Sequence, residues 1–313
     1  MSTPNSVTQK KPVVAIENTK KRRRPVDFTP YMLLIPWFIG MAVFRVYPIF
    51  QSAWISTRRY HPILGDMGSV GLSHYRTLFG YNVFRDSFFA TMRYVLIGTP
   101  TVLVTAFFVA FILNFKLKGV NLFRTAYYVP SILGGNVAVA ILWGQLFRGA
   151  GPINTVLDAI GIGAQMWLTD PNFMPFTLIF LSAWQFGSVM LIFLAALQSV
   201  SPTLYEAASI DGARKWRQLF TITLPLITPM LLFNAVNVLL RHFQEFNAAF
   251  LIPPTPGGPL RATYFLNLMI YDYAFRFHRY DFASALTWIF LGIIGIISVI
   301  LFTSSKYWVH NSD

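Results

Sequence analysis

Six long apolar segments constrain what this chain can fold into more than any other feature of its sequence. They run over Tyr31–Trp54, Phe88–Leu113, Leu122–Phe147, Phe176–Gln198, Leu226–Ile252 and Phe282–Thr303. The shortest holds 22 residues. At about 1.5 Å of rise per residue, a helix of that length covers the roughly 30 Å hydrocarbon core of a bilayer. The sequence therefore predicts an all-α integral membrane protein with six transmembrane helices.

The composition supports a membrane location. Hydrophobic residues make up 55% of the chain and charged residues only 12%, which is too apolar for a soluble protein of 313 residues. The net charge of +13 could indicate nucleic acid as a partner. However, Lys and Arg gather in the N-terminal tail and in short loops beside the apolar segments, as the positive-inside rule and anionic headgroups favour. We therefore expect membrane lipid as a partner, and no nucleic acid.

The same charges predict an orientation. The tail and the loops on its side of the membrane hold 14 Lys and Arg residues, and the opposite loops hold 8, namely Arg58, Arg59, Arg76, Arg85, Arg148, Arg261, Arg276 and Arg279. This asymmetry favours a cytosolic N-terminus, and an even number of spans places the C-terminus on the same side. Residues 1–27 are predicted to be a disordered basic tail, and residues 28–313 a single membrane domain.

The sequence carries no catalytic constellation. It has no cysteine, which excludes disulfides and thiolate chemistry. It also lacks a phosphate-binding loop ending in Gly-Lys-Ser or Gly-Lys-Thr, so the chain is not expected to hydrolyse ATP. The histidines are scattered without metal-ligand spacing and are predicted to be surface or interface residues, with no metal site, at His61, His74, His242, His278 and His310.

A polar stretch, Leu204–Pro225, lies between two apolar segments and is predicted to be a docking element that faces the cytosol. Ser201 and Pro202 are typical of a helix start, with the serine hydroxyl as the expected cap. Gly212 can adopt the left-handed conformation that ends such a helix. A basic turn follows at Arg214, Lys215 and Arg217, and Pro225 is expected to kink the entry into the next apolar segment. Two short helices at an angle are predicted.

This stretch resembles the EAA loop of membrane permease subunits in bacterial ABC importers. The resemblance rests on Glu206-Ala207-Ala208, Gly212 after three further residues, and Ile222-x-Leu224-Pro225 after nine more. In that family the loop contacts the ATP-binding subunit. The resemblance therefore implies a coupling loop within residues 199–225, with contact residues Tyr205, Glu206, Ala207, Ala208, Asp211, Gly212, Arg214, Ile222, Leu224 and Pro225.

The same resemblance implies the type I permease architecture and a set of partners. They are a second homologous permease, two ATP-binding subunits and an extracytoplasmic solute-binding protein. The location implied is the bacterial cytoplasmic membrane, with both termini cytosolic. No cofactor is expected on this chain, because ATP and Mg²⁺ would bind the partner subunits.

Three short motifs in the predicted outer loops resemble those of carbohydrate-type ABC permeases. They are Gly71-Leu72 with Tyr75, Gly151 with Asn154, and Gly257-Gly258-Pro259 with Thr263. With them, the resemblance covers nearly the whole chain, from Leu33 to Lys306. Taken without the family, Gly-Gly-Pro indicates a tight turn, and residues 149–154 indicate a loop that re-enters a helix.

Polar side chains inside the fifth apolar segment indicate a substrate path, because such groups are costly in hydrocarbon. Steps of three and four place Asn234, Asn237, Arg241 and Gln244 on one predicted helix face. With the fourth segment, where Trp184 offers an aromatic face, the predicted path residues are Gln185, Ser188, Asn237, Arg241, Gln244, Glu245 and Asn247. Interhelical hydrogen bonds or an internal Arg241–Glu245 pair are the alternative interpretation.

The predicted cargo is a sugar or oligosaccharide. Arg45, Arg93 and Arg241 would suit an acidic glycan or a phosphorylated polyol, although snorkelling of the first two towards the interface also explains them. An ABC permease for another polar solute and an ATP-independent secondary transporter remain alternative functions.

Overall fold

The computed structural model describes residues 29–115, 119–135, 137–252 and 255–310. The predicted basic tail, residues 1–27, lies outside them. The chain divides into two compact units, residues 1–49 and 50–313. Its N-terminal helical region consists of α1 (Thr29–Met41), the π-helix η1 (Ala42–Val46) and α2 (Tyr47–Ser56).

The second unit is almost entirely helical. Its helices are α3 (Ser73–Phe79), α4 (Asn82–Leu113), α5 (Val120–Leu133), α6 (Val137–Leu146), α7 (Pro152–Ala159), α8 (Met174–Trp184), α9 (Gly187–Ser199), α10 (Pro202–Ile210), α11 (Lys215–Gln218), η2 (Leu219–Thr223), α12 (Leu224–Phe243), α13 (Asn247–Leu251), η3 (Pro259–Arg261), α14 (Leu266–Tyr271), η4 (Asp272–Arg276) and α15 (Tyr280–Trp308). The all-α prediction missed one feature, an antiparallel hairpin of β1 (Arg58–His61) and β2 (Gly65–Ser69).

The six predicted apolar segments correspond to six helical regions, and two of these are bent by more than 40° at a break. Within the described part of the chain, four helical stretches are long and apolar enough to cross a membrane: Tyr31–Ser56, Asn82–Leu113, Lys215–Leu251 and Tyr280–Trp308. The third segment instead forms α5 and α6 at 105° to each other, and the fourth forms α8 and α9 with a 48° bend. Six spans result if each bent pair counts as one, which agrees with the predicted number.

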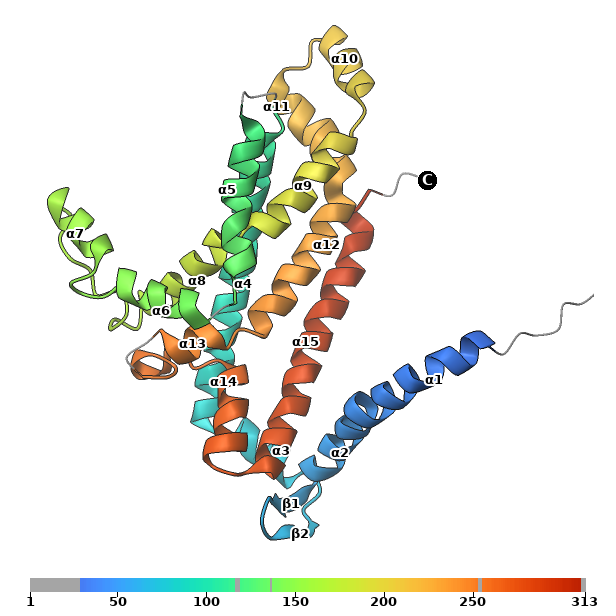
Figure 1. Ribbon diagram of the computed structural model, residues 1–313, viewed down its shortest axis with the longest axis vertical. Helices are drawn as coiled ribbons and strands as arrows, with labels where there is room; N and C mark the ends of the chain where they lie inside the picture. The colour runs from blue at the N-terminus through green and yellow to red at the C-terminus, as the bar shows by residue number, and fades with distance from the viewer. Residues whose placement is uncertain (1–28, 116–118, 136, 253–254, 311–313) are drawn as a thin grey trace, which may run out of the picture. The chain divides into compact units, whose positions relative to one another are not determined.

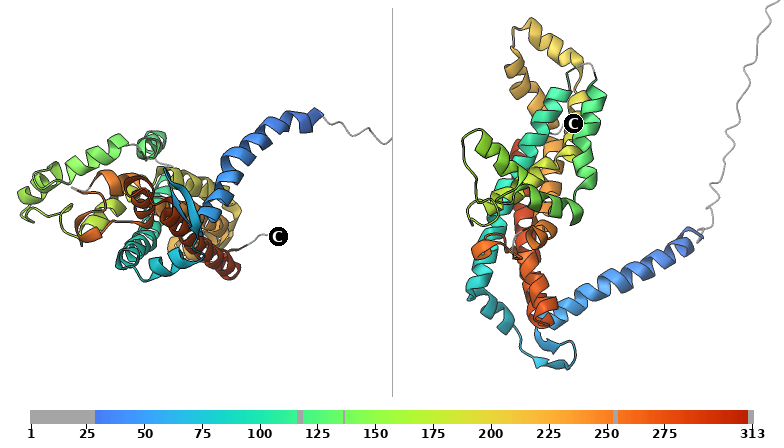
Figure 2. Two further views of the ribbon diagram at one scale, coloured as in Figure 1. Left: turned by 90° about the horizontal axis from the view of Figure 1, so that it is seen from below. Right: turned by 60° about the vertical axis from the view of Figure 1, so that its left-hand side comes forward.

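Helix α4 is the centre of the second unit and packs along α8, α9 and α12. Small side chains permit close approach, since Ala106 and Ala110 of α4 are fully buried. Other buried clusters join α6, α8 and α13, and join α3, α14 and α15. Within this unit, α10 and α11 lie at one end and the hairpin with α3 at the opposite end (Figures 1 and 2).

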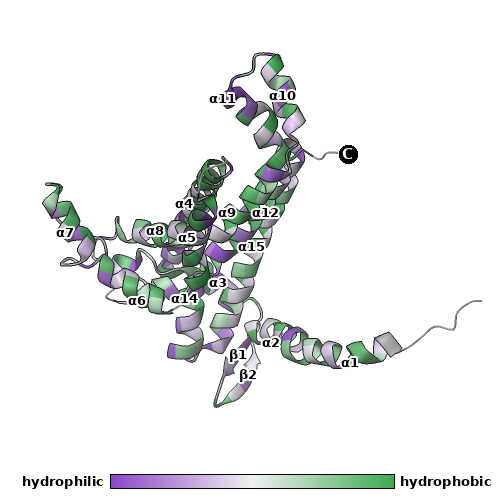
Figure 3. Ribbon diagram, turned by 45° about the horizontal axis from the view of Figure 1, so that its top comes forward, coloured by the Kyte–Doolittle hydropathy of each residue, from purple (hydrophilic) through white to green (hydrophobic). Residues whose placement is uncertain are grey.

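Hydropathy follows this arrangement. Figure 3 shows hydrophobic residues along most of α12 and α15, whereas α11 is hydrophilic. The polar stretch predicted from sequence therefore forms an end of the second unit, outside the apolar helices.

Candidate functional site: a polar cavity between broken helices

Three helix breaks meet around one cavity in the second unit. The first is at Gly134-Gly135 after α5, the second is at Gln185-Phe186 between α8 and α9, and the third is at residues 244–246 between α12 and α13. Gly135 has a positive φ of 74°, which explains why the chain turns there. Non-helical backbone at membrane depth is tolerated where it is buried in protein or lines a cavity.

Carbonyl groups freed by these breaks are satisfied by amide and hydroxyl side chains. Asn247 donates to the carbonyl of Gly135 at 3.0 Å, and Asn267 donates to that of Gln244 at 3.1 Å. Ser131 donates to the carbonyl of Gln185 at 3.0 Å. These bonds fix the helix ends at the breaks, so the backbone and side chains that line the cavity have defined positions.

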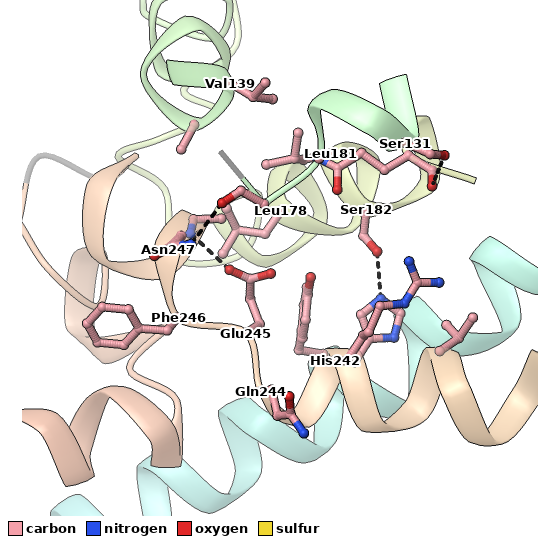
Figure 4. Close-up of a pocket in the computed structure, with 18 residues that line it drawn as sticks. Ser131, Val139, Leu178, Leu181, Ser182, His242, Gln244, Glu245, Phe246 and Asn247 are labelled. Carbon is pink, nitrogen blue, oxygen red and sulfur yellow. Dashed lines mark hydrogen bonds between the residues drawn. The ribbon is translucent and has the colours of Figure 1, made fainter. Parts of the chain in front are cut away.

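The cavity has a volume of about 300 Å³. The described residues that line it are Tyr94, Ser131, Gly134, Gly135, Val139, Ala140, Leu178, Leu181, Ser182, Gln185, Val238, Arg241, His242, Gln244, Glu245, Phe246, Asn247 and Ala248. Figure 4 shows the side chains of Glu245 and Asn247, at the entry to α13, beside Leu178 of α8, whereas the ring of Phe246 points away from them. Hydrogen-bonding groups and apolar walls thus share one concave surface, as in sites for polar solutes.

Five of the seven predicted path residues lie at this cavity: Gln185, Arg241, Gln244, Glu245 and Asn247. The other two do not line it. The backbone amide of Ser188 donates to Ser131 at 3.0 Å, and the Asn237 side chain donates to the carbonyl of Phe233 in its own helix. Trp184 is also outside the lining and stacks on Trp143 with ring centroids 5.6 Å apart.

The predicted polar stripe on α12 is split. Asn234 is buried and its amide donates towards the carbonyl of Val189 on α9 at 3.5 Å, whereas Asn237, Arg241 and Gln244 are exposed. Asn234 therefore belongs to the α9–α12 contact, which is the interhelical role considered as the alternative.

The alternative Arg241–Glu245 pair does not form among the described residues. Helix α12 ends at Phe243, so Glu245 is no longer one helical turn after Arg241. Its carboxylate accepts instead from the backbone N–H of Ala248 at 2.9 Å, in the first turn of α13.

His242 has a role at the cavity that its sequence context did not predict. Its prediction as a surface or interface residue is wrong, because the side chain is buried and binds two other helices. Its Nδ1 lies 2.9 Å from Thr99 Oγ1 of α4. Its Nε2 lies 2.7 Å from Ser182 Oγ of α8, the bond that Figure 4 shows. Tyr94 packs edge-on against the ring at 5.0 Å. The imidazole thus joins three spans beside the cavity.

His74 is likewise buried, contrary to the sequence-based prediction. Its Nε2 lies 3.0 Å from the carbonyl oxygen of Arg58 and 3.5 Å from the carboxylate of Asp281. Arg279 binds the same carboxylate at 3.0 Å. This cluster ties β1 and α3 to the start of α15.

The coupling stretch, residues 199–225, forms two short helices, as predicted, and Gly212 between them has a positive φ of 76°. One detail is wrong: the Ser201 hydroxyl contacts Thr203 Oγ1 and does not cap the backbone. Among the predicted contact residues, Glu206, Ala207, Asp211, Gly212 and Arg214 are exposed. The others, Tyr205, Ala208, Ile222, Leu224 and Pro225, are half-buried.

Tyr205 faces inwards. Its hydroxyl lies 2.9 Å from Thr223 Oγ1, at the end of the π-helix that leads into α12. Gln218 adds a second tie, since its amide donates to Ser209 Oγ at 2.9 Å and to the carbonyl of Ala213 at 3.0 Å. Pro225 is the second residue of α12, in the first turn, where a proline without an N–H is tolerated.

The motifs of the predicted outer loops have structural roles. The hydroxyl of Tyr75 donates to Ser56 at 2.8 Å. A Cβ on Gly258, which has a φ of 70°, would lie 2.8 Å from Thr263 Oγ1. Burial raises the pKa of the neighbouring Tyr264 above its ordinary value. Its protonated hydroxyl donates to Asp272 at 2.7 Å, which fixes the loop to η4.

Broken apolar helices around a polar cavity define a membrane transport protein. Residues 70–311 match the family described as the binding-protein-dependent transport system inner membrane component, and the chain belongs to that family. It is 40% identical over 295 residues to the probable ABC transporter permease protein YesP of Bacillus subtilis (strain 168), covering 93% of this chain and 95% of the relative.

Two further similarities agree. The multiple sugar-binding transport system permease protein MsmF of Streptococcus mutans serotype c (strain ATCC 700610 / UA159) is 31% identical over 278 residues, which cover 88% of this chain and 93% of MsmF. A chain of the bacterial alginate ABC transporter, in complex with alginate pentasaccharide-bound periplasmic protein, aligns with a TM-score of 0.78 at 24% identity, over 90% of this chain and 94% of that one. The structural likeness confirms the permease fold.

Proposed function

We propose that this chain is one transmembrane subunit of an ABC importer that moves a carbohydrate into the cytosol by alternating access. The observation that carries the proposal is the cavity at three helix breaks, where amides, hydroxyls and one ion of each sign converge. Sugars present hydroxyl groups that need many hydrogen bonds and C–H faces that pack on apolar or aromatic surfaces. The permease MsmF, a relative named for multiple sugars, supports this class of cargo.

ATP hydrolysis is assigned to partner subunits. The exposed residues Glu206, Ala207, Asp211 and Gly212 supply a surface at one end of the second unit. The bonds of Tyr205 and Gln218 connect that surface to the π-helix that leads into α12. Because α12 ends at the cavity, a displacement of α10 would reach the cargo through one helix. A second homologous permease and an extracytoplasmic binding protein complete the proposed assembly, with both termini of this chain in the cytosol.

Co-purification tests the proposed partners. We expect the tagged chain, co-expressed with candidate ATP-binding and permease subunits, to retain the ATP-binding subunit through purification. The change Glu206→Ala should reduce its recovery severalfold, whereas Asp158→Ala, which removes an exposed carboxylate of α7, should leave it unchanged. Failure to recover any ATP-binding subunit, together with wild-type transport by the Glu206→Ala variant, would refute the assignment.

A further inference from the structure

A second cavity, of about 630 Å³, lies beside α6 and α13, the two helices that also line the polar cavity. On α6, Val139 and Ala140 line the polar cavity, whereas Ile141 and Gly144 line the second one. On α13, Ala248 lines the first cavity, and Leu251 and Ile252 line the second. The two cavities are therefore consecutive spaces beside one helix pair. The second is also lined by residues of the 145–149 and 164–169 segments and by Asn154.

Asn154 builds the wall of this second cavity. Its buried side chain donates to the carbonyls of Gly149 at 3.0 Å and Gln165 at 2.9 Å. Its oxygen accepts from the backbone of Gln165 at 3.1 Å and from the indole of Trp167 at 2.9 Å. The turn at Gly151 is also tight, since a Cβ there would lie 2.5 Å from the carbonyl oxygen of Leu146. The Gly151 and Asn154 motif thus fixes the segments that carry Arg148 and Trp167.

The charged side chain that lines the second cavity among the described residues is the cation Arg148. Arg148 donates to Gln145 Oε1 at 2.8 Å, which orients the guanidinium, and no carboxylate pairs with it among the described residues. A guanidinium binds a carboxylate through a planar pair of donors. The polar cavity differs, because Arg241 and Glu245 both line it and their charges balance. The indole of Trp167 and the hydroxyl of Thr169 complete a surface for a sugar ring.

We propose that the second cavity is an outer saccharide subsite that takes a carboxylate-bearing sugar unit, with Arg148 as its anion-binding residue. The inference rests on the proposed function. It adds that the cargo is acidic and is long enough to occupy consecutive subsites.

Protection of an introduced thiol tests the subsite in the complete complex. Because the chain has no cysteine, Thr169→Cys places a single thiol of this chain at the cavity wall, and Ile160→Cys places a control on an exposed site outside the lining. Reaction with a fluorescent maleimide is followed with an alginate trisaccharide as the acidic probe and maltotriose as the neutral one.

We expect the alginate trisaccharide to slow labelling at position 169 by about tenfold at a concentration of about nine times its dissociation constant, because about nine sites in ten are then occupied. Maltotriose should have little effect, and neither probe should change labelling at position 160. Arg148→Gln should abolish the protection, and Arg148→Lys should restore part of it because the positive charge is retained. Absence of protection by the acidic probe, equal protection by maltotriose, or protection that persists in Arg148→Gln would overturn the proposal.

Uptake by the same complexes separates this inference from the function on which it rests. ATP-dependent uptake of a neutral saccharide without protection at position 169 leaves the importer function standing and overturns the acidic subsite. Absence of ATP-dependent uptake for both saccharides overturns the proposed carbohydrate transport itself.

Discussion

His242 shows, at the scale of single residues, how one side chain organises the cavity wall. Its ring nitrogens join α4 and α8 through Thr99 and Ser182. Replacing it with alanine removes both bonds and takes its partner from the buried hydroxyl of Thr99, and we predict a loss of about 1–3 kcal/mol in the free energy of unfolding. Thermal unfolding of the detergent-solubilised chain measures this. His278→Asn is the control, because His278 is exposed and has a positive φ of 53° that asparagine tolerates. Equal stability of the two variants would contradict the assigned role.

Gly151 offers a second prediction at this scale. Alanine there would bring a Cβ to 2.5 Å from the carbonyl oxygen of Leu146 and 2.7 Å from that of Gln145, so the turn must open. We expect Gly151→Ala to lower the melting temperature clearly, whereas Gly149→Ala, two residues earlier, has open space and should have little effect. Similar melting temperatures for the two variants would show that the turn is not close-packed.

Sequence patterns predicted the residue types at the cavity better than their contacts. Amides and charges at the end of the fifth apolar segment were visible because polar groups in such a segment stand out, and five of the seven residues lie at the cavity. His242 was missed because its partners are 60 and 143 positions away, and a lone histidine carries no local pattern. Contacts between distant segments depend on packing, which spacing along one helix does not encode.

The coupling stretch gives the clearest prediction at the scale of elements. The hydroxyl of Tyr205 ties α10 to Thr223 at the entry of α12. Tyr205→Phe removes only that bond, worth about 1 kcal/mol. We therefore predict that uptake per ATP hydrolysed falls while ATP hydrolysis by the complex continues. Tyr307→Phe is the control, because Tyr307 is 93% exposed.

A double-mutant comparison sharpens the test of this tie. Thr223→Val should cause the same uncoupling as Tyr205→Phe, and the double variant should be no worse than either single one. Additive losses would mean that the two hydroxyls act separately.

Helix starts and turns were predicted well where a local rule specifies them. Breaks within the long helices were predicted poorly, because they depend on packing. The helix start at Pro202 and the turn at Gly212 followed from proline and glycine chemistry. The 105° turn after Gly134-Gly135 was not predicted, because two glycines within a long apolar segment permit a turn without requiring one. The β1–β2 hairpin was missed because it is short and exposed and carries no clear alternation of apolar residues.

At the scale of the whole molecule, the chain has the features expected of a permease subunit. They are six apolar regions, a polar cavity at the breaks in their helices, and an exposed coupling stretch. The family match over residues 70–311 confirms the class of protein that the sequence resemblance implied. Both the cavity and the coupling stretch belong to the second unit, and α12 joins them. We propose that import is energised by ATP on partner subunits.

Uptake of a labelled saccharide by sealed proteoliposomes tests that claim most directly. The proteoliposomes contain the chain with its partner permease, the ATP-binding subunits and the binding protein. We predict uptake that requires ATP on the side of the coupling stretch, that is absent when this chain is reconstituted alone, and that is lost in the Glu206→Ala variant. Uptake by this chain alone without ATP would contradict the claim and identify a secondary transporter.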